Sequence, residues 1–417
     1  MIRIITMVVK LMHYLLATIF LRFSSRFIWL HNDDYVATFQ KYFGVMLRFV
    51  PENEEDDAQE ENAANHDGRN LVEIRNKWAL YLFRFGTALG GEMAFILFFT
   101  FLYWNVDEAV GRHVVLVWGI CMYFGQALKD MIRWPRPTSP PVAKLDDNWV
   151  LEFGMPSTHA IVGSAVPAAV IYFTDSIYQN YFGIGVLIGV AICTLVCLSR
   201  LYLGMHSILD ILGGLLIFTS FFPVATFLIN QYESEFFACE WGWLVALFVG
   251  IELCLGYPSQ DHWNPTRADT FGVVGCFIGL LVADWLNHQE SSPSLNELVF
   301  LEETCREQCV WRSISDIILL AVIRQAVGIA VLLLTKKIAK KVGRVVASYL
   351  AMIVPMCMIN ESGNGRVTPG VGTELFTMFY TYAMVSFIAG YATPLLFEEL
   401  GIGKDTSILN IVLPYFY

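Results

Sequence analysis

The chain has 417 residues, of which 56% are apolar and only 16% are charged, and its formal net charge at pH 7 is −11. Soluble globular domains carry about 25% charged residues, so this composition excludes an ordinary water-soluble enzyme. The negative balance argues against a nucleic-acid partner. The mean hydropathy of +0.52 indicates a protein that is surrounded by membrane lipids.

The N-terminal region, residues 1–50, is expected to be amphipathic and to lie at the membrane interface. Its first part is apolar but carries several basic side chains. A cleaved signal peptide would have a clean apolar centre and an A-x-A-like site, and neither is evident. A poor first membrane span is the alternative. Residues 51–70 read PENEEDDAQEENAANHDGRN, and such dense negative charge without large apolar side chains predicts a disordered linker.

Apolar runs follow one another along the rest of the chain with short gaps between them. A helix of about 20 residues crosses the hydrocarbon core of a bilayer, and the alternation typical of barrel strands is absent. We therefore predict an all-α, polytopic bundle of roughly 8–10 transmembrane helices. Residues 71–290 form its core and residues 291–417 supply the C-terminal spans. The candidate spans lie near Phe85–Trp104, His113–Leu128, Ala160–Phe173, Phe182–Leu198, Ile208–Ile229, Trp241–Tyr257, Phe271–Leu286, Ile317–Leu334, Arg344–Ile359 and Phe376–Phe397.

The first of three polar clusters at the edges of these runs is KDMIRWPRP, residues 129–137. Lys129 and Arg136 are separated by two helical turns if the helix persists, but Pro135 should break it. The two cations can therefore converge on one anion, one from a helix end and the other from the following loop. The alternative is a basic belt at the membrane interface.

The second cluster is MPSTHA, residues 155–160. A Pro-Ser-Thr sequence before an apolar run predicts a helix start, with Ser157 or Thr158 near the cap. Free N–H groups and the positive end of the helix dipole make such a start a phosphate site. His159 lies in the first turn, close to any anion that binds there. Taken by itself, His159 is better explained as an interfacial histidine.

The third cluster is SRLYLGMHSILD, residues 199–210. His206 and Asp210 are four residues apart at the start of an apolar helix, so they share a face. A carboxylate beside an imidazole fixes its tautomer and leaves the other ring nitrogen free to attack. An aspartate in an apolar helix is expected to face the interior and to have a partner. Arg200 adds a further anion-binding cation.

Together the clusters contain the groups that phosphoryl transfer to an imidazole requires. Cations and backbone donors hold the equatorial oxygens, one histidine attacks in line, and another protonates the leaving alkoxide. We expect no metal ion, because the basic residues neutralise the charge and no carboxylate-rich cluster beside them is available to hold Mg²⁺. No other cofactor is expected. The predicted partner is a lipid phosphate substrate.

In order and spacing, the clusters resemble the signature of the type 2 phosphatidic acid phosphatase (PAP2) superfamily: Lys-x6-Arg-Pro, Pro-Ser-x-His and Ser-Arg-x5-His-x3-Asp. The resemblance implies that His206 is the nucleophile that forms a phosphohistidine, that Asp210 orients it, and that His159 is the general acid. It makes residues 71–290 a PAP2-type core. The residues implied to bind phosphate are Lys129, Arg136, Ser157, Thr158 and Arg200. Thr158 departs from the superfamily, which commonly has glycine there, so a side chain crowds the pocket.

A closer resemblance is to the sphingosine-1-phosphate phosphatases. It rests on RWPRPTSPPVAKL, MPSTHA, VCLSRLYLGMHSILDI, FGTALGGEMAF at 85–95 and TRADT at 266–270. It implies a multi-pass enzyme of the endoplasmic reticulum membrane that hydrolyses sphingosine 1-phosphate and its dihydro analogue. Arg267 and Asp269 in TRADT either touch the substrate amine or structure the loop.

Two other readings remain. The same chemistry could serve another substrate, such as phosphatidic acid, a polyprenyl diphosphate or glucose 6-phosphate. Alternatively, the chain could be a catalytically dead scaffold or transporter with a vestigial site. The intact set of Lys129, Arg136, His159, Arg200, His206 and Asp210 argues against the second reading.

Two observations predict opposite orientations of the protein in the membrane. If every candidate span crosses, the catalytic loops lie on the same side as KKIAKKVGR, residues 336–344, and the positive-inside rule makes that side cytosolic. The resemblance implies a luminal site. A miscounted segment, Ile317–Leu334 or Arg344–Ile359, would remove the conflict. We follow the resemblance.

Overall fold

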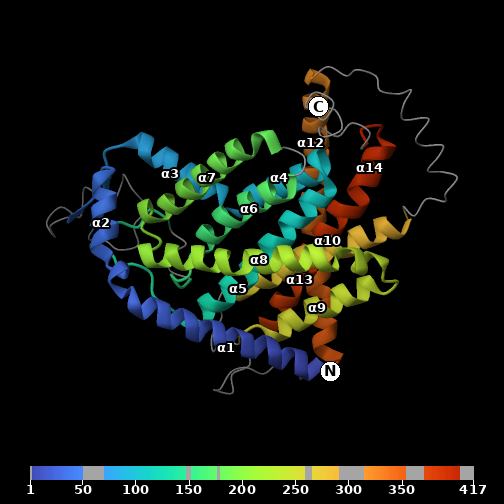
Figure 1. The fold of residues 1–417 in the computed structure, drawn as a ribbon, viewed down its shortest axis with the longest axis horizontal. Coiled ribbons are helices and arrows are strands. Elements are labelled where there is room, and N and C mark those ends of the chain that lie inside the picture. The colour runs from blue at the N-terminus through green and yellow to red at the C-terminus, as the bar shows by residue number, and fades with distance from the viewer. Residues whose placement is uncertain are drawn as a thin grey trace.

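A computed structural model describes residues 2–49, 70–146, 152–175, 179–258, 265–290, 314–353 and 371–403. Within these ranges, seven helices are long and apolar enough to cross a membrane, or eight if one bent pair forms a single span. Figure 1 shows the helices packed side by side as one bundle. The predicted all-α, multi-spanning architecture is confirmed. The part of the chain that the structure describes has seven or eight candidate spans, whereas roughly 8–10 were predicted for the whole chain.

The N-terminal region is helical and ends in a small hairpin. Its elements are α1 (Ile2–Arg26), η1 (Ile28–His31), α2 (Asp33–Tyr42), β1 (Val45–Phe49) and β2 (Asn70–Ile74). Residues 6–26 of α1 are long and apolar enough to cross a membrane, so an interfacial position for this region stays a prediction. Asn32 caps α2 by accepting a hydrogen bond from the Asp34 N–H, as cap residues do.

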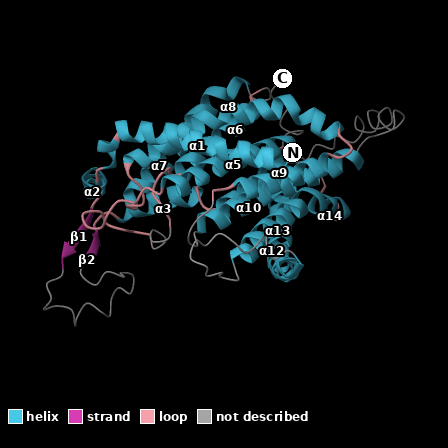
Figure 2. Ribbon diagram, turned by 90° about the horizontal axis from the view of Figure 1, so that it is seen from below, coloured by secondary structure: helices cyan, strands magenta, loops and turns pink. Residues whose placement is uncertain are grey.

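The hairpin is a departure from the all-helical expectation. Gly44 takes a left-handed φ of 83°, which glycine adopts without steric penalty, and it turns the chain from α2 into β1. β1 and β2 pair antiparallel, with Val45 opposite Ile74, and stand beside α2 at one end of the molecule (Figure 2). The predicted acidic linker lies outside the described residues, except for Asn70, which begins β2.

The first predicted core span, Phe85–Trp104, is broken rather than continuous. α3 (Lys77–Leu89) and α4 (Glu92–Phe101), which continues into the π-helical η3 (Leu102–Val106), are bent by 60° at Gly90 and Gly91. The break brings the backbone against a neighbouring ring, since a β-carbon at Gly90 would lie 2.6 Å from His159 Cδ2. Any larger residue at position 90 would push the His159 ring away.

The centre of the bundle is built around α5. The core elements are α5 (Glu108–Ile132), α6 (Thr158–Thr174), η5 (Gln179–Tyr181), α7 (Phe182–Tyr202), α8 (Ile208–Ala238), α9 (Gly242–Gly256) and α10 (Pro265–Glu290). In the apolar stretch of α5, 78% of the residues are buried inside the protein, whereas the corresponding value for α7 is 22%. The difference arises because α6, α8 and α10 all pack on α5. Val114, Cys121 and Leu128 recur every seven residues along α5 and are fully buried.

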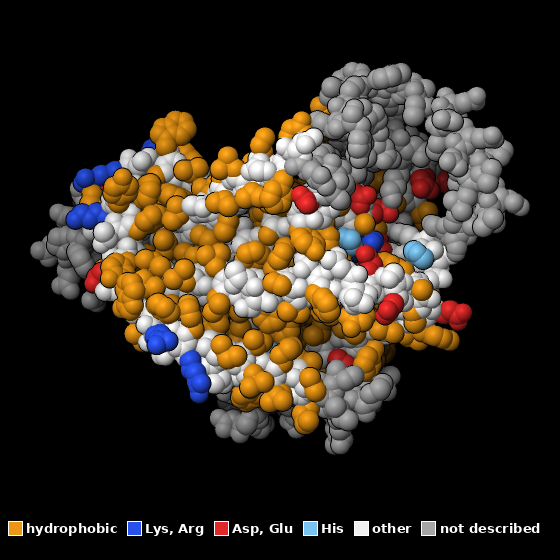
Figure 3. Space-filling model, viewed as in Figure 1, with side chains coloured by type: hydrophobic (Ala, Val, Ile, Leu, Met, Phe, Trp, Pro, Cys, Tyr) orange, Lys and Arg blue, Asp and Glu red, His pale blue; other side chains and the backbone are white. Residues whose placement is uncertain are grey.

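The outer surface of this bundle is apolar. Figure 3 shows apolar side chains over most of the face formed by α1, α7 and α8, with charged side chains mainly toward its edges. On α7, Leu187 is 70% exposed. A contiguous apolar surface of this kind indicates contact with lipid rather than water.

The C-terminal elements pack against α10. They are α12 (Ile314–Ile353), α13 (Val371–Phe387), η6 (Ile388–Ala392) and α14 (Thr393–Glu399). α10 and α13 approach closely because α10 carries glycines: a β-carbon at Gly279 would lie 2.1 Å from the Ala383 carbonyl oxygen. Small residues permit such close packing between membrane helices.

The prediction of separate spans at Ile317–Leu334 and Arg344–Ile359 was wrong as far as residue 353. One helix, α12, contains the first of these and the described part of the second. The intervening lysines are good helix formers and no proline interrupts them. With 40 residues, α12 is about 60 Å long, roughly twice the thickness of the hydrocarbon core.

Candidate active site

The first polar cluster lies where α5 ends and a loop begins. Arg133 adopts a left-handed conformation (φ 53°, ψ 36°) and ends the helix, which leaves Lys129 in its last turn and Arg136 in the loop. Both cations meet a single carboxylate: Lys129 Nζ and Arg136 Nη2 each lie 3.2 Å from Glu152 Oε2. The two basic groups therefore converge on one anion position.

Glu152 is the residue that occupies this position, and the sequence patterns did not identify it. Lys129 lowers the pKa of Glu152 most, and Arg136 lowers it further, while burial opposes them. Its carboxylate is therefore ionised and lies between the two cations. Lys129 itself is only 1% exposed, so it depends on such a partner.

The second cluster forms the start of α6. Ser157 is the N-cap, and its hydroxyl accepts a hydrogen bond from the Ala160 N–H. The Ser157 N–H donates to the Asp210 carbonyl oxygen at 2.9 Å, which ties this helix start to the start of α8. Thr158 and His159 occupy the first turn, where helical N–H groups have no partner within the helix. His159 lies close enough to Arg200, Lys129 and Arg136 to interact electrostatically with them.

The third cluster spans the end of α7 and the start of α8. Arg200, in the last turn of α7, is 3% exposed and donates to Thr87 Oγ1 at 3.3 Å. Its Nε has no hydrogen-bond partner among the described residues. His206 precedes α8 and is 1% exposed. Its Nδ1 lies 3.7 Å from Asp210 Oδ2, which is beyond hydrogen-bond distance. Nδ1 is therefore the ring nitrogen paired with the carboxylate, and Nε2 is the other one.

Asp210 is held firmly by the cap of α8. Its Oδ2 accepts a hydrogen bond from the Ser207 N–H at 2.7 Å, and its own N–H donates to Ser207 Oγ at 3.2 Å. This reciprocal arrangement is a capping box. The carboxylate therefore has a fixed position beside His206, and a small rotation of the imidazole would complete a hydrogen bond between them.

His206 is neutral in the absence of ligand. Burial lowers its pKa well below the ordinary value, and the positive charges of Arg136, Arg200 and Lys129 lower it further. An imidazole attacks only when one ring nitrogen carries no proton. The three cations thus favour the neutral form of the ring.

Comparison with known proteins identifies this arrangement. Residues 110–233 match the PAP2 superfamily. The chain is 33% identical to sphingosine-1-phosphate phosphatase 2 of Mus musculus over 89% of its own length and 98% of the relative. It is 34% identical to sphingosine-1-phosphate phosphatase 1 of Mus musculus over 83% of its own length and 78% of the relative. The chain belongs to the sphingosine-1-phosphate phosphatase family.

More distant similarity extends to fungi, and no solved structure matches the chain. A dihydrosphingosine 1-phosphate phosphatase of Saccharomyces cerevisiae is 25% identical over 50% of this chain and 53% of its own. This phosphatase is accordingly an integral membrane hydrolase of phosphoric monoesters that acts in sphingolipid metabolism. Its PAP2 region contains all three polar clusters.

The structure also places residues from the N-terminal region of the phosphatase against the catalytic loops. His31 Nδ1 lies 2.9 Å from Ser207 Oγ. Asp33 accepts from the N–H and the hydroxyl of Thr138, at 3.0 and 2.5 Å. The Gln40 side chain binds the backbone of Ala143 at both ends. Residues 28–42 therefore brace the site, which the assignment of a separate region 1–50 did not anticipate.

Lys144 is a further brace within the loop that follows α5. Its ammonium group donates to the carbonyl oxygens of Pro137 and Gly204, at 2.5 and 2.7 Å. Burial lowers its pKa to about 8. It joins the loop that carries Arg136 to the loop that carries His206. The segment RWPRPTSPPVAKL contains Lys144 but assigned it no role. No motif pointed to Gln40 or His31, because their partners are backbone atoms and a hydroxyl that are remote in sequence.

The structure thus brings the predicted site residues of the phosphatase into one neighbourhood. His206 interacts electrostatically with Arg136, Arg200, Lys129 and His159. The helix start at Ser157 and Thr158 is joined to the same loops through the backbone of Asp210. Residues separated by 81 positions in the chain, from 129 to 210, therefore surround one space.

Proposed function

We propose that the phosphatase hydrolyses sphingosine 1-phosphate and dihydrosphingosine 1-phosphate to the sphingoid base and inorganic phosphate, through a phosphohistidine on His206. The observation that carries the proposal is the convergence of Lys129 and Arg136 on one carboxylate beside a buried, neutral His206. The names of the relatives support the choice of substrate.

In the first step, Nε2 of His206 attacks phosphorus and the bond between phosphorus and the ester oxygen breaks. Lys129, Arg136 and Arg200 hold the equatorial oxygens, assisted by the N–H groups at the start of α6. Burial lowers the pKa of His159, as do Arg200, Lys129 and Arg136, and the negative charge of a bound phosphate raises it again. With phosphate bound, His159 gives a proton to the departing alkoxide, which leaves as the alcohol of the sphingoid base. Asp210 stabilises the positive charge that develops on the attacking imidazole.

In the second step, water attacks the phosphohistidine and the bond between phosphorus and nitrogen breaks. His159 has lost its proton in the first step and now accepts one from the water, since an acid in one direction serves as the base in the next half-reaction. Inorganic phosphate forms and His206 returns to its neutral state. Release of phosphate lets Glu152 return to Lys129 and Arg136.

The proposal assigns charge neutralisation to the basic side chains and uses no divalent ion. Purified protein in detergent should therefore release phosphate from sphingosine 1-phosphate in the presence of EDTA at close to its rate without EDTA. It should prefer sphingosine 1-phosphate to phosphatidic acid by about tenfold or more, as expected where substrate polar groups are recognised. Phosphate release measured on both lipids, with and without chelator, checks both statements. Activity lost only on chelation would contradict the mechanism, and equal rates would contradict the substrate.

We place the protein in the endoplasmic reticulum membrane with its catalytic loops toward the lumen. The basic cluster at 336–344 favours the opposite orientation, with the catalytic loops in the cytosol. Lys336 in this cluster forms an ion pair with Glu92, so its charge has a structural explanation that does not depend on orientation.

Sealed endoplasmic reticulum vesicles distinguish the two orientations. A cysteine at Thr138, which is exposed in the catalytic loop, should react with a membrane-impermeant maleimide only after detergent is added. A cysteine at Glu235, exposed near the far end of α8, should react before it. The unsubstituted protein supplies the background, and the reverse pattern would assign the loops to the cytosol.

A further inference from the structure

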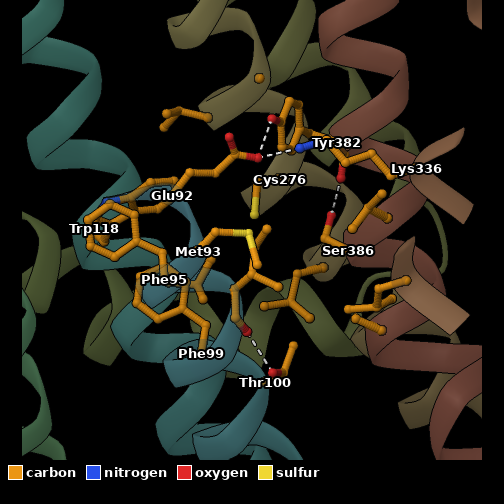
Figure 4. Close-up of a pocket in the computed structure, with 18 of the residues that line it drawn as sticks. Glu92, Met93, Phe95, Phe99, Thr100, Trp118, Cys276, Lys336, Tyr382 and Ser386 are labelled. Atoms are coloured by element: carbon orange, nitrogen blue, oxygen red, sulfur yellow. Dashed lines mark hydrogen bonds and ion pairs between the residues drawn. The ribbon is translucent and has the colours of Figure 1, made fainter. Parts of the chain in front are cut away.

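A cavity of about 280 Å³ lies between α4, α5, α10, α12 and α13. Its wall is mainly apolar, with Phe95, Phe99, Trp118 and Cys276 toward the middle (Figure 4). Along α10 it extends from Asp269 to Leu280, which corresponds to about 16 Å of helix. This is close to one leaflet, or half of the ~30 Å hydrocarbon core, and therefore to the reach of one lipid chain.

One end of the cavity is polar. Glu92 accepts a hydrogen bond from the Tyr382 hydroxyl at 2.7 Å and pairs with Lys336, and all three are at the same end in Figure 4. Asp269 also lines the cavity, and its side chain is exposed although helices surround it. No hydrogen bond or ion pair joins the Asp269 carboxylate to another described residue. The polar end therefore includes a carboxyl group that has no partner among the described residues.

This polar end adjoins the catalytic site. Gln126 lines the cavity one helical turn before Lys129 on α5, about 4.5 Å along the axis. Glu92 follows directly after the bend at Gly90, whose backbone contacts the His159 ring. The Asp269 carboxylate is close enough to Lys129 and Glu152 to interact electrostatically with both. The acidic end of the cavity thus continues into the phosphate site.

Three environments follow one another from the catalytic loops into the bundle: cations, then carboxylates, then an apolar cavity. A sphingoid 1-phosphate presents the matching groups in the same order, with phosphate on the first carbon, an ammonium on the second, and a single alkyl chain beyond. The geometry points to this cavity as the binding site of the sphingoid chain, with Asp269 as the residue that binds the ammonium group. This inference rests on the proposed function, because it takes its ligand from the proposed substrate class.

The acidic end explains a preference for sphingoid phosphates over phosphatidic acid, which the cations alone cannot supply. Lys129, Arg136 and Arg200 attract any phosphate monoester, including phosphatidic acid, which lacks an ammonium group. An ammonium placed next to these cations would be repelled unless a carboxylate faced it. Asp269 is positioned to do so, whereas the charge of Glu92 is balanced by Lys336.

The first test concerns the ammonium group. Asp269→Asn should lower the ratio of kcat/KM for sphingosine 1-phosphate to that for octadecyl phosphate, which has no amine, by about tenfold or more, since a hydrogen bond to a charged group is lost. Glu235→Gln removes an exposed carboxylate at the far end of α8 and should leave the ratio unchanged. A wild-type ratio in Asp269→Asn would overturn the assignment of Asp269.

The second test concerns the chain. Each methylene that leaves water for an apolar site changes affinity by about fourfold, so wild-type kcat/KM should rise from an eight-carbon to an eighteen-carbon sphingoid phosphate. Cys276→Trp should reduce this long-to-short ratio by about tenfold or more because it fills the middle of the cavity. Met93→Phe, a smaller change in the same wall, should reduce it less. Leu187→Trp on the lipid-facing side of α7 is the control.

The outcomes distinguish a wrong assignment of the cavity from a wrong assignment of the substrate. If the wild-type protein hydrolyses sphingosine 1-phosphate but the cavity variants keep the wild-type chain-length ratio, the cavity is not the chain site and the proposed function stands. If the wild-type protein hydrolyses other phosphates but not sphingosine 1-phosphate, the proposed substrate fails and this inference fails with it. A loss of folding in Cys276→Trp would remove activity on both chain lengths, and Met93→Phe then decides the result.

Discussion

Replacing His206 with alanine should abolish phosphate release, with a loss of about 10⁴-fold or more, because removal of a nucleophile leaves only binding and electrostatic stabilisation. The variant should still fold and enter the membrane. The cap of α8 is formed by Ser207 and Asp210 rather than by His206, so the start of that helix is retained. The measurement is phosphate release from sphingosine 1-phosphate by membranes with matched amounts of protein.

Labelling with radioactive phosphate makes the test specific. Wild-type protein quenched during turnover should carry an acid-labile phosphate, and the His206→Ala protein should carry none. His288→Ala is a matched control, since His288 is an exposed histidine near the far end of α10 and its loss should change neither readout. Wild-type turnover or an acid-labile label in the His206→Ala protein would remove His206 as the nucleophile.

Replacing His159 with alanine should slow hydrolysis of the lipid phosphate by about 10²- to 10⁴-fold, the range typical of general acid catalysis. The size of the loss should depend on the leaving group. A sphingoid alkoxide needs a proton as it departs, whereas p-nitrophenolate does not. Formation of the phosphoenzyme from p-nitrophenyl phosphate should therefore be affected much less, and the phosphoenzyme should accumulate because the water step also lacks its base.

Lys129→Met provides the comparison for His159. Lys129 contacts the anion position directly, and every substrate brings the same phosphate to it. Its removal should therefore reduce the two activities by similar factors. If His159→Ala behaved in the same way, with equal losses on the lipid phosphate and on p-nitrophenyl phosphate, then His159 would hold phosphate rather than transfer a proton.

Access to the phosphate site has a consequence for how the phosphatase selects substrates. Glu152 occupies the cations in the absence of ligand, so a weakly charged ester competes poorly with it. A dianionic monoester brings more charge and can replace the carboxylate. Glu152 also neutralises the buried cations between turnovers, because it pairs with both Lys129 and Arg136. Without it these buried charges would be unpaired, which is strongly unfavourable.

Much of this site could be predicted from local patterns. A Pro-Ser-Thr sequence before an apolar run predicted the start of α6, and the structure places Ser157 at its cap. The four-residue spacing of His206 and Asp210 predicted that they share one face of a helix start, but His206 precedes the N-cap Ser207 and lies outside α8. Their side chains nevertheless lie 3.7 Å apart. These features depend on residues within one or two helical turns, where the geometry of the backbone relates spacing to position.

Breaks and continuities of helices were harder to predict. Gly90 and Gly91 interrupt what hydropathy presents as one span. The His159 ring, from a residue 69 positions further along the chain, packs against Gly90 at this break. Conversely, the lysines of α12 look like a polar gap between two spans, but one helix continues through them. Hydropathy indicates whether a segment can be surrounded by lipid or by water. It does not indicate whether the backbone of that segment bends.

By itself the sequence determined the membrane class, the helical architecture and the set of polar groups for phosphoryl transfer, because these follow from composition and from contacts between near neighbours in the chain. Only the tertiary structure brought Glu152 to Lys129 and Arg136, His31 to Ser207, and the acidic Asp269 to the mouth of an apolar cavity. Each of these arrangements joins side chains from separate helices and loops. Their distances are set by how helices pack, which no spacing along one segment records.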